Sequence, residues 1–158
     1  MLRRTHAGLE ADVVVPRDEH RAYAMSSVVR QVRTVPGVRS LPRRELDRLV
    51  RLVEDRWDSA DALVALDPTD PWLVLGFAVG AAGDPPVLTY LHVRGGFRGL
   101  GLGTLLASLL GVTPGRPALV EVPTWDLVRE NPGTGHPIGL LRNPRWDLTL
   151  VDPREATR

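Results

Sequence analysis

Apolar and polar positions recur most regularly in the segment Leu41–Trp57, where the pattern predicts an amphipathic helix. The apolar residues that share one side of it are Leu46, Leu49, Val50, Val53 and Trp57. Arginines occupy most of the other side, which is expected to face solvent; the alternative is that it attracts an acidic acceptor or nucleic acid. Apolar residues at the same spacing predict a second helix over Arg17–Thr34. Trp57 and Trp72 are expected to lie in the core.

Runs rich in β-branched and aromatic residues predict the strands of a sheet. They are Asp12–Val15, Ala62–Leu66, Trp72–Gly80, Val87–Val93 and Ala118–Val122. The second and third runs flank a turn at Asp67–Pro71 and therefore predict an antiparallel hairpin. After the last run, Pro123–Glu130 is expected to form a short helix, and Ile138–Leu141 with Leu148–Val151 a final hairpin.

The most distinctive segment is Val87–Gly111, which reads VLTYLHVRGGFRGLGLGTLLASLLG. A strand is followed by a turn, Arg94–Gly103, that holds five glycines and two arginines, and then by a helix predicted over Leu102–Leu110. The first N–H groups of a helix have no internal partner, and its dipole is positive at that end, so this arrangement suits an anion. Glycines leave the backbone open to a phosphate, and the fork of Arg98 matches phosphate geometry.

Two common phosphate-binding loops do not fit this turn. A Walker loop requires a lysine, and the chain contains none, because all 20 of its basic residues are arginine. A dinucleotide fingerprint requires G-x-G-x-x-G, whereas Gly99–Gly103 reads G-x-G-x-G. Glu121 lies near where a ribose-binding acid is expected, but only 55 residues follow Gly103, too few to complete a doubly wound sheet.

Composition narrows the class of protein. The length of 158 residues predicts a single domain over 1–158, with 43% apolar residues to build a core. A formal net charge of +1 gives no general attraction to nucleic acid or membrane, and no apolar run approaches membrane-spanning length. The absence of cysteine excludes disulfides, zinc thiolates and a thiol nucleophile, and no metal site is expected. The N-terminus has no apolar signal region, so a cytoplasmic location is the expectation.

The strand Leu91-His92-Val93 followed by Arg98-Gly99-Leu100-Gly101-Leu102-Gly103 resembles the acetyl-CoA motif of the GNAT N-acetyltransferase superfamily. The predicted element order, β-α-α-β-β-β-α-β-α-β-β, is also that of the GNAT fold. The resemblance implies an α/β (α+β) fold with a mixed sheet of six to seven strands and helices on both faces. More weakly, the glycine turn together with Asn143-Pro144 resembles the small GNAT-fold acetyltransferases of tailed bacteriophages.

This resemblance implies an enzyme that transfers an acetyl group from acetyl-CoA to a primary amine by direct attack on the thioester. The backbone of Leu91 and Val93 is then expected to face the pantetheine arm, and an N–H there to stabilise the oxyanion. The backbone N–H groups expected to hold the pyrophosphate are those of Arg98, Gly99, Leu100, Gly101, Leu102, Gly103 and Thr104. The acceptor is not specified by the sequence, and the protein is expected to be a monomer or homodimer.

Amine acetylation requires a general base, because an alkylammonium ion cannot attack. Glu121 is one candidate, with a salt-bridged strand-end carboxylate as the alternative interpretation. His92 is another, but its side chain alternates with those of Leu91 and Val93 and is expected on the opposite face; His136 is a third. The tyrosine that protonates the thiolate in many family members has no counterpart, which leaves open a noncatalytic CoA-binding or virus–host interaction module.

Overall fold

The computed structural model describes residues 1–35, 38–59, 61–113 and 115–122, and the backbone of three later strands at 128–130, 137–140 and 147–150. The strands are β1 (Leu2–Arg4), β2 (Glu10–Val14), β3 (Asp61–Leu66), β4 (Val74–Ala81), β5 (Val87–Val93), β6 (Pro117–Val120), β7 (Val128–Glu130), β8 (Pro137–Leu140) and β9 (Asp147–Leu150). The helices are α1 (Asp18–Val32), α2 (Arg43–Ser59), the 3₁₀ turn η1 (Gly95–Phe97) and α3 (Leu102–Leu109).

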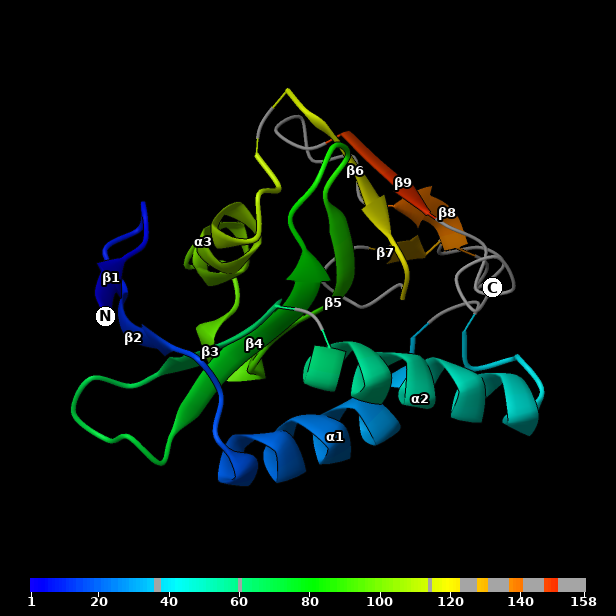
Figure 1. Cartoon of the computed structure of the whole chain (residues 1–158), viewed down its shortest axis with the longest axis horizontal. Coiled ribbons are helices and arrows are strands. Elements are labelled where there is room, and N and C mark those ends of the chain that lie inside the picture. The colour runs from blue at the N-terminus through cyan, green and yellow to red at the C-terminus, as the bar shows by residue number, and fades with distance from the viewer. Residues whose placement is uncertain are drawn as a thin grey trace.

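Seven of these strands form one mixed sheet in the order β1-β2-β3-β4-β5-β6-β9. Neighbours are antiparallel from β1 to β5, whereas β5 with β6 and β6 with β9 are parallel. Helices α1 and α2 lie on one side of the sheet and α3 on the other (Figure 1). The predicted α/β class, the mixed sheet, the hairpin of β3 with β4 and the parallel pairing of β5 with β6 are therefore confirmed.

The apolar side of α2 is buried against one face of the sheet, as its spacing predicts. Leu49, Val53 and Trp57 are buried there together with α1 residues and Phe77 of β4. The Trp57 ring meets the Phe77 ring edge-on, with the centroids 5.8 Å apart. Since truncation of a buried tryptophan costs about 3–5 kcal/mol, this contact is a main attachment of α2 to the sheet.

The short helix α3 covers the opposite face. Leu102, Leu106 and Ala107 are buried there and pack in one cluster with Leu88 and Leu91 of β5. From β2 to β6 the observed order, β-α-α-β-β-β-α-β, is the order that the resemblance predicts for the GNAT fold. Helix α3 packs on β5, the strand that precedes it, and the glycine turn connects the two.

The structure differs from the sequence-based predictions in four places. Strand β1 was not anticipated, because its residues are exposed and carry no alternating pattern. The part of 123–130 that is described is a strand, β7, rather than a helix, and it pairs with β8. The predicted final hairpin is wrong, because β9 pairs in parallel with β6, where it completes the hydrogen bonding of an otherwise open strand edge.

Trp72 is the fourth difference, since 80% of its surface is exposed. Strand β4 begins only at Val74, so Trp72 lies in the preceding turn. Its backbone N–H is held there by the Asp70 carboxylate at 3.1 Å. The predicted strand, Trp72–Gly80, begins two residues before β4 does. The tryptophan ring consequently lies outside the core.

Candidate functional site

The glycine turn joins the end of β5 to the beginning of α3. Gly101 is the N-cap of α3 with φ of 82°, and no side chain caps the helix there. The first intrahelical bond runs from the Leu105 N–H to the Gly101 carbonyl at 3.0 Å. The N–H groups of Leu102, Gly103 and Thr104 precede this bond and have no partner within the helix. The turn therefore presents an uncapped, positive helix end.

Gly99, Gly101 and Gly103 are each glycine for a different structural reason. A Cβ on Gly99, where φ is 76°, would meet no atom within 4 Å, so the backbone there is open to a ligand. A Cβ on Gly101 would lie 2.6 Å from the His6 ring, so this glycine makes room for the chain's own β1–β2 connection. A Cβ on Gly103 would make ordinary 3.6 Å contacts with the side chains of Leu91 and Val93. Open access to a phosphate, expected for all three glycines, is supported by this geometry at Gly99.

Arg98 lies beside the end of β5. Its Nε donates a hydrogen bond to the Val93 carbonyl oxygen at 3.0 Å, and the residue remains exposed. Leu100, between two glycines, is also exposed. The bond from Arg98 folds the turn back onto the end of β5.

Strand β5 pairs with β6 only through its first residues. The register pairs Val87 with Leu119 and Leu88 with Val120. The register with β4 then shifts so that Thr89 has no opposite residue, which makes it a β-bulge. The last bond toward β6 runs from the Val122 N–H to the Thr89 carbonyl at 3.1 Å, and no described residue continues the pairing. A bulge bends its strand, and the β5 and β6 ribbons separate beyond their paired ends (Figure 1).

The backbone of β5 beyond the bulge faces this divergence at alternate residues. The Arg94 N–H donates to the Leu75 carbonyl of β4 at 2.8 Å. Because consecutive residues direct their backbone groups to opposite edges of a strand, Leu91 and Val93 direct theirs away from β4. The structure thus places the two residues expected to face the pantetheine on the diverging edge.

Glu121 lies where the two strands diverge, and it is 3% exposed. The Nε and Nη2 atoms of Arg56 donate to its two carboxylate oxygens, each at 3.2 Å, and the Thr89 hydroxyl donates to Oε1 at 2.6 Å. A cleft of about 540 Å³ borders all three residues and is also lined by Asp61 and Val87. This carboxylate is therefore salt-bridged, as the alternative interpretation holds, and it also lines a cleft at the point of divergence.

His92 faces the α1–α2 side of the sheet, opposite to Leu91 and Val93. Its ring packs on Phe77 with the centroids 5.2 Å apart. Burial, followed by the positive charges of Arg98, Arg30 and Arg94, lowers the pKa of His92 to about 4. The imidazole is consequently neutral at pH 7, and its basicity is low.

Sequence reasoning did not find the partners of Glu121. Arg56 belongs to the side of α2 that was expected to face solvent, and Thr89 carries no motif; only the folded sheet brings them together. His136 lies outside the described residues. Within the part of the chain that the structure describes, no three histidine, acidic or cysteine residues form a metal-binding group. No described helix is both long and apolar enough to cross a membrane.

Comparison with known proteins adds little to this geometry. No protein-family model matches the sequence, and no curated protein matches it. Among solved structures, the chain is similar to an acetyltransferase of the GNAT family from Staphylococcus aureus Mu50, with 10% identity and a TM-score of 0.38. The match covers 63% of this chain and 62% of that one, less than two thirds of either. So distant a likeness carries no argument about activity, and the assignment of the fold rests on the strand order.

Proposed function

We propose that this protein is an acetyl-CoA-dependent N-acetyltransferase. The observation that carries the proposal is the divergence of β5 from β6 at the Thr89 bulge, immediately before a glycine turn and an uncapped helix. A diverging pair of parallel strands leaves one backbone edge free to pair with an extended, amide-containing ligand. The uncapped helix end next to it suits the phosphates of the same ligand.

The residues present fit acetyl-CoA in two places. The pyrophosphate would lie against the N–H groups of Leu102, Gly103 and Thr104, with open backbone at Gly99 and the guanidinium of Arg98 nearby. The amides of the pantetheine arm would pair with the backbone of Leu91 and with the N–H of Val93, because the Val93 carbonyl already accepts the bond from Arg98. Each hydrogen bond to a charged group contributes about 1.5–3 kcal/mol, so several of them account for micromolar affinity.

We assign the general base to Glu121. When bound, acetyl-CoA supplies an activated acyl group; the protein must supply a site where the incoming ammonium loses its proton. Glu121 lines the cleft at the point of divergence, and Arg56 and Thr89 fix the orientation of its carboxylate. An acceptor amine in this cleft would approach the carboxylate from the α1–α2 side, and an N–H on the diverging edge would stabilise the oxyanion.

The second candidate function is a noncatalytic CoA-binding or interaction module. The specific observation in its favour is that both oxygens of Glu121 are already bound by Arg56. The sequence also has only two tyrosines, Tyr23 and Tyr90, and neither follows β6, where the family places a general acid. In this alternative the ion pair is a structural link, and acetyl-CoA is bound without turnover.

A thiol-release assay separates the two functions. Because the chain contains no cysteine, any thiol that appears in the presence of acetyl-CoA and an amine is free CoA. The enzyme proposal predicts amine-dependent thiol release with at least one member of a panel of primary amines, including polyamines, amino sugars and lysine peptides. Binding of CoA by calorimetry without thiol release for any of these would favour the noncatalytic module.

A further inference from the structure

A groove of about 560 Å³ runs along the seam between the C-terminal half of α1 and the N-terminal half of α2. Its floor is apolar and its margins are charged. The apolar residues are Val29, Val32, Leu46 and Val50, and the charged ones are Arg33, Arg43, Asp47 and Arg51. These helices cover the face of the sheet opposite to α3, so the groove is separate from the glycine turn (Figure 1).

The charge of the seam differs between its two ends. At the far end, Arg21 is paired with Glu54 at 3.6 Å and with Asp58 at 3.1 Å, so the one arginine there faces two carboxylates. At the groove, three arginines face one carboxylate, Asp47, a formal excess of two positive charges. None of the three arginines has an ion-pair partner among the described residues. Carboxylates outnumber the arginine at one end, whereas the seam is electropositive at the other.

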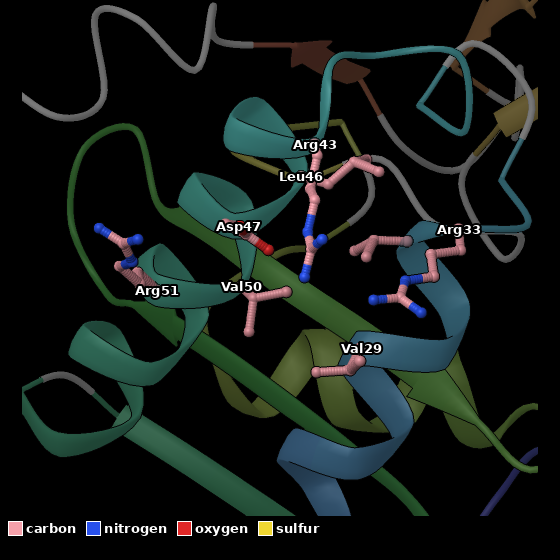
Figure 2. Close-up of a pocket in the computed structure, with 8 residues that line it drawn as sticks. Val29, Arg33, Arg43, Leu46, Asp47, Val50 and Arg51 are labelled. Carbon is pink, nitrogen blue, oxygen red and sulfur yellow. The ribbon is translucent and has the colours of Figure 1, made fainter.

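Two of these arginines lie on opposite walls. Figure 2 shows Arg33, directly after α1, and Arg43 from α2 extending toward one another across the groove, with Val29 and Val50 nearby. Two like charges that face each other repel, and an anion between them replaces that repulsion with two charge-assisted hydrogen bonds. Val29 is 37% exposed, which leaves apolar surface next to the charges. The groove therefore offers an anion site and an apolar surface side by side.

We propose that the α1–α2 groove binds a small amphiphilic anion, with its acidic group between Arg33 and Arg43 and its apolar part on the valine and leucine floor. The planar guanidinium fork can donate two hydrogen bonds to two oxygens of one acidic group, such as a carboxylate or a sulfonate. The volume is within the range of about 300–1,000 Å³ that is typical of small-molecule sites. This site goes beyond the acetyl-transfer site, because none of its lining residues belongs to the glycine turn or to the Glu121 cleft.

A fluorescent probe of the same chemistry tests the proposal. The naphthalene sulfonate 8-anilinonaphthalene-1-sulfonate carries one acidic group on an apolar body and fluoresces when bound. The Arg33→Gln/Arg43→Gln double variant removes both facing charges, and Arg44→Gln is the matched control. Arg44 lies on the same helix, is 87% exposed and does not line the groove.

The proposal predicts saturable binding of one probe per chain, and a Kd at least tenfold higher in the double variant than in Arg44→Gln. Decanoate should displace the probe, whereas decanol at the same concentration should not, because it lacks the charge. A Val29→Asp variant, confirmed as folded by circular dichroism, should also lose binding. Saturating CoA should leave the probe bound.

Equal probe affinity in the double variant and in Arg44→Gln would overturn the proposal, since the probe would then lie elsewhere. Displacement by decanol as strongly as by decanoate would reduce the groove to an apolar patch and overturn it too. Displacement by polyglutamate but not by decanoate would mean that the groove takes an acidic protein segment instead of a small anion.

Discussion

Arg56 of α2 and Glu121, directly after β6, form a bidentate ion pair in which both nitrogen–oxygen distances are 3.2 Å. The pair joins a helix to the point where β5 and β6 diverge, across 65 positions of sequence. Glu121 is buried, whereas the Arg56 side chain is 40% exposed. This pair links α2 to the edge of the cleft and fixes the orientation of the Glu121 carboxylate.

Removal of the arginine should destabilise the protein. Arg56→Met leaves a buried carboxylate with only the Thr89 hydroxyl as a described partner. The loss of one partner of a fully buried pair costs about 3–5 kcal/mol; the exposure of Arg56 reduces this to about 1–3 kcal/mol. Urea denaturation at pH 7 measures the loss. Arg44→Met, an exposed change on the same helix, should stay within about 0.5 kcal/mol, and equal stability of the two variants would contradict a structural role for the pair.

The Glu121→Gln variant tests the assignment of the base. Glutamine keeps the shape of the side chain and one oxygen for Arg56 or Thr89, but it takes up no proton. The turnover of the best amine should fall by about 10²–10⁴-fold, the usual contribution of a general base. The affinity for CoA should change less than twofold, because the phosphates and pantetheine would contact other residues in the proposed complex. Turnover within threefold of the wild type would assign the base elsewhere.

His92 gives the protein a defined loss of stability in acid. Its pKa is about 4 in the folded chain and 6.5 when unfolded, so the unfolded state binds more protons between these values. Stability is therefore full above pH 6.5 and decreases as the pH falls toward 4, by about 2 kcal/mol between pH 7 and pH 5. Burial is the main cause of the lowered pKa, and the positive charges of Arg98 in the turn, Arg30 from α1 and Arg94 after β5 add to it.

His92→Phe should remove this part of the acid sensitivity. Phenylalanine matches the packing of the histidine ring on Phe77 and does not titrate. Urea denaturation of both proteins at pH 7 and pH 5 measures the difference, because carboxylates elsewhere contribute equally to each. The same loss of stability in the two proteins would show that His92 does not carry the effect.

Two glycines of the turn should respond in opposite ways to alanine. Gly101 has φ of 82° and would place its Cβ 2.6 Å from the His6 ring, so Gly101→Ala should destabilise by more than about 1 kcal/mol. Gly103 lies inside α3 with ordinary 3.6 Å contacts, so Gly103→Ala should keep or raise stability by up to about 1 kcal/mol. Melting temperatures of the two variants test this; a fall for Gly103→Ala equal to that for Gly101→Ala would mean that the turn is differently packed.

The sequence predicts those elements whose local pattern and tertiary environment agree. Strand β5 has the predicted bounds, Val87–Val93, and α3 begins at Leu102 as its apolar spacing indicates. Helix α2 follows for the same reason, because one apolar stripe both forms the helix and buries it. In each case the residues that specify the element also make its contacts.

The remaining features depend on contacts between distant segments. Nothing local to β9 indicates that it pairs with β6, and the bulge at Thr89 appears only in the register with β4. Trp72 is a large aromatic residue of the kind expected in a core, but it is exposed in a turn. Arg56 is one arginine among several on α2, and it differs from them only because Glu121 lies opposite.

The central claim, that the glycine turn holds the phosphates of CoA, is tested most directly by one pair of charge substitutions on α3. Thr104→Glu places a carboxylate in the first turn, where it favours the helix by about 0.3–1 kcal/mol but opposes a bound pyrophosphate. Ser108→Glu adds the same charge one turn later, at an exposed position remote from the helix N-terminus.

Calorimetric titration of CoA into the wild type and both variants is the decisive measurement. We expect micromolar affinity for the wild type, at least tenfold weaker binding by Thr104→Glu, equivalent to about 1.4 kcal/mol, and a change of less than twofold for Ser108→Glu. Equal CoA affinity of the two folded variants, or no binding by the wild type at millimolar CoA, would contradict the account.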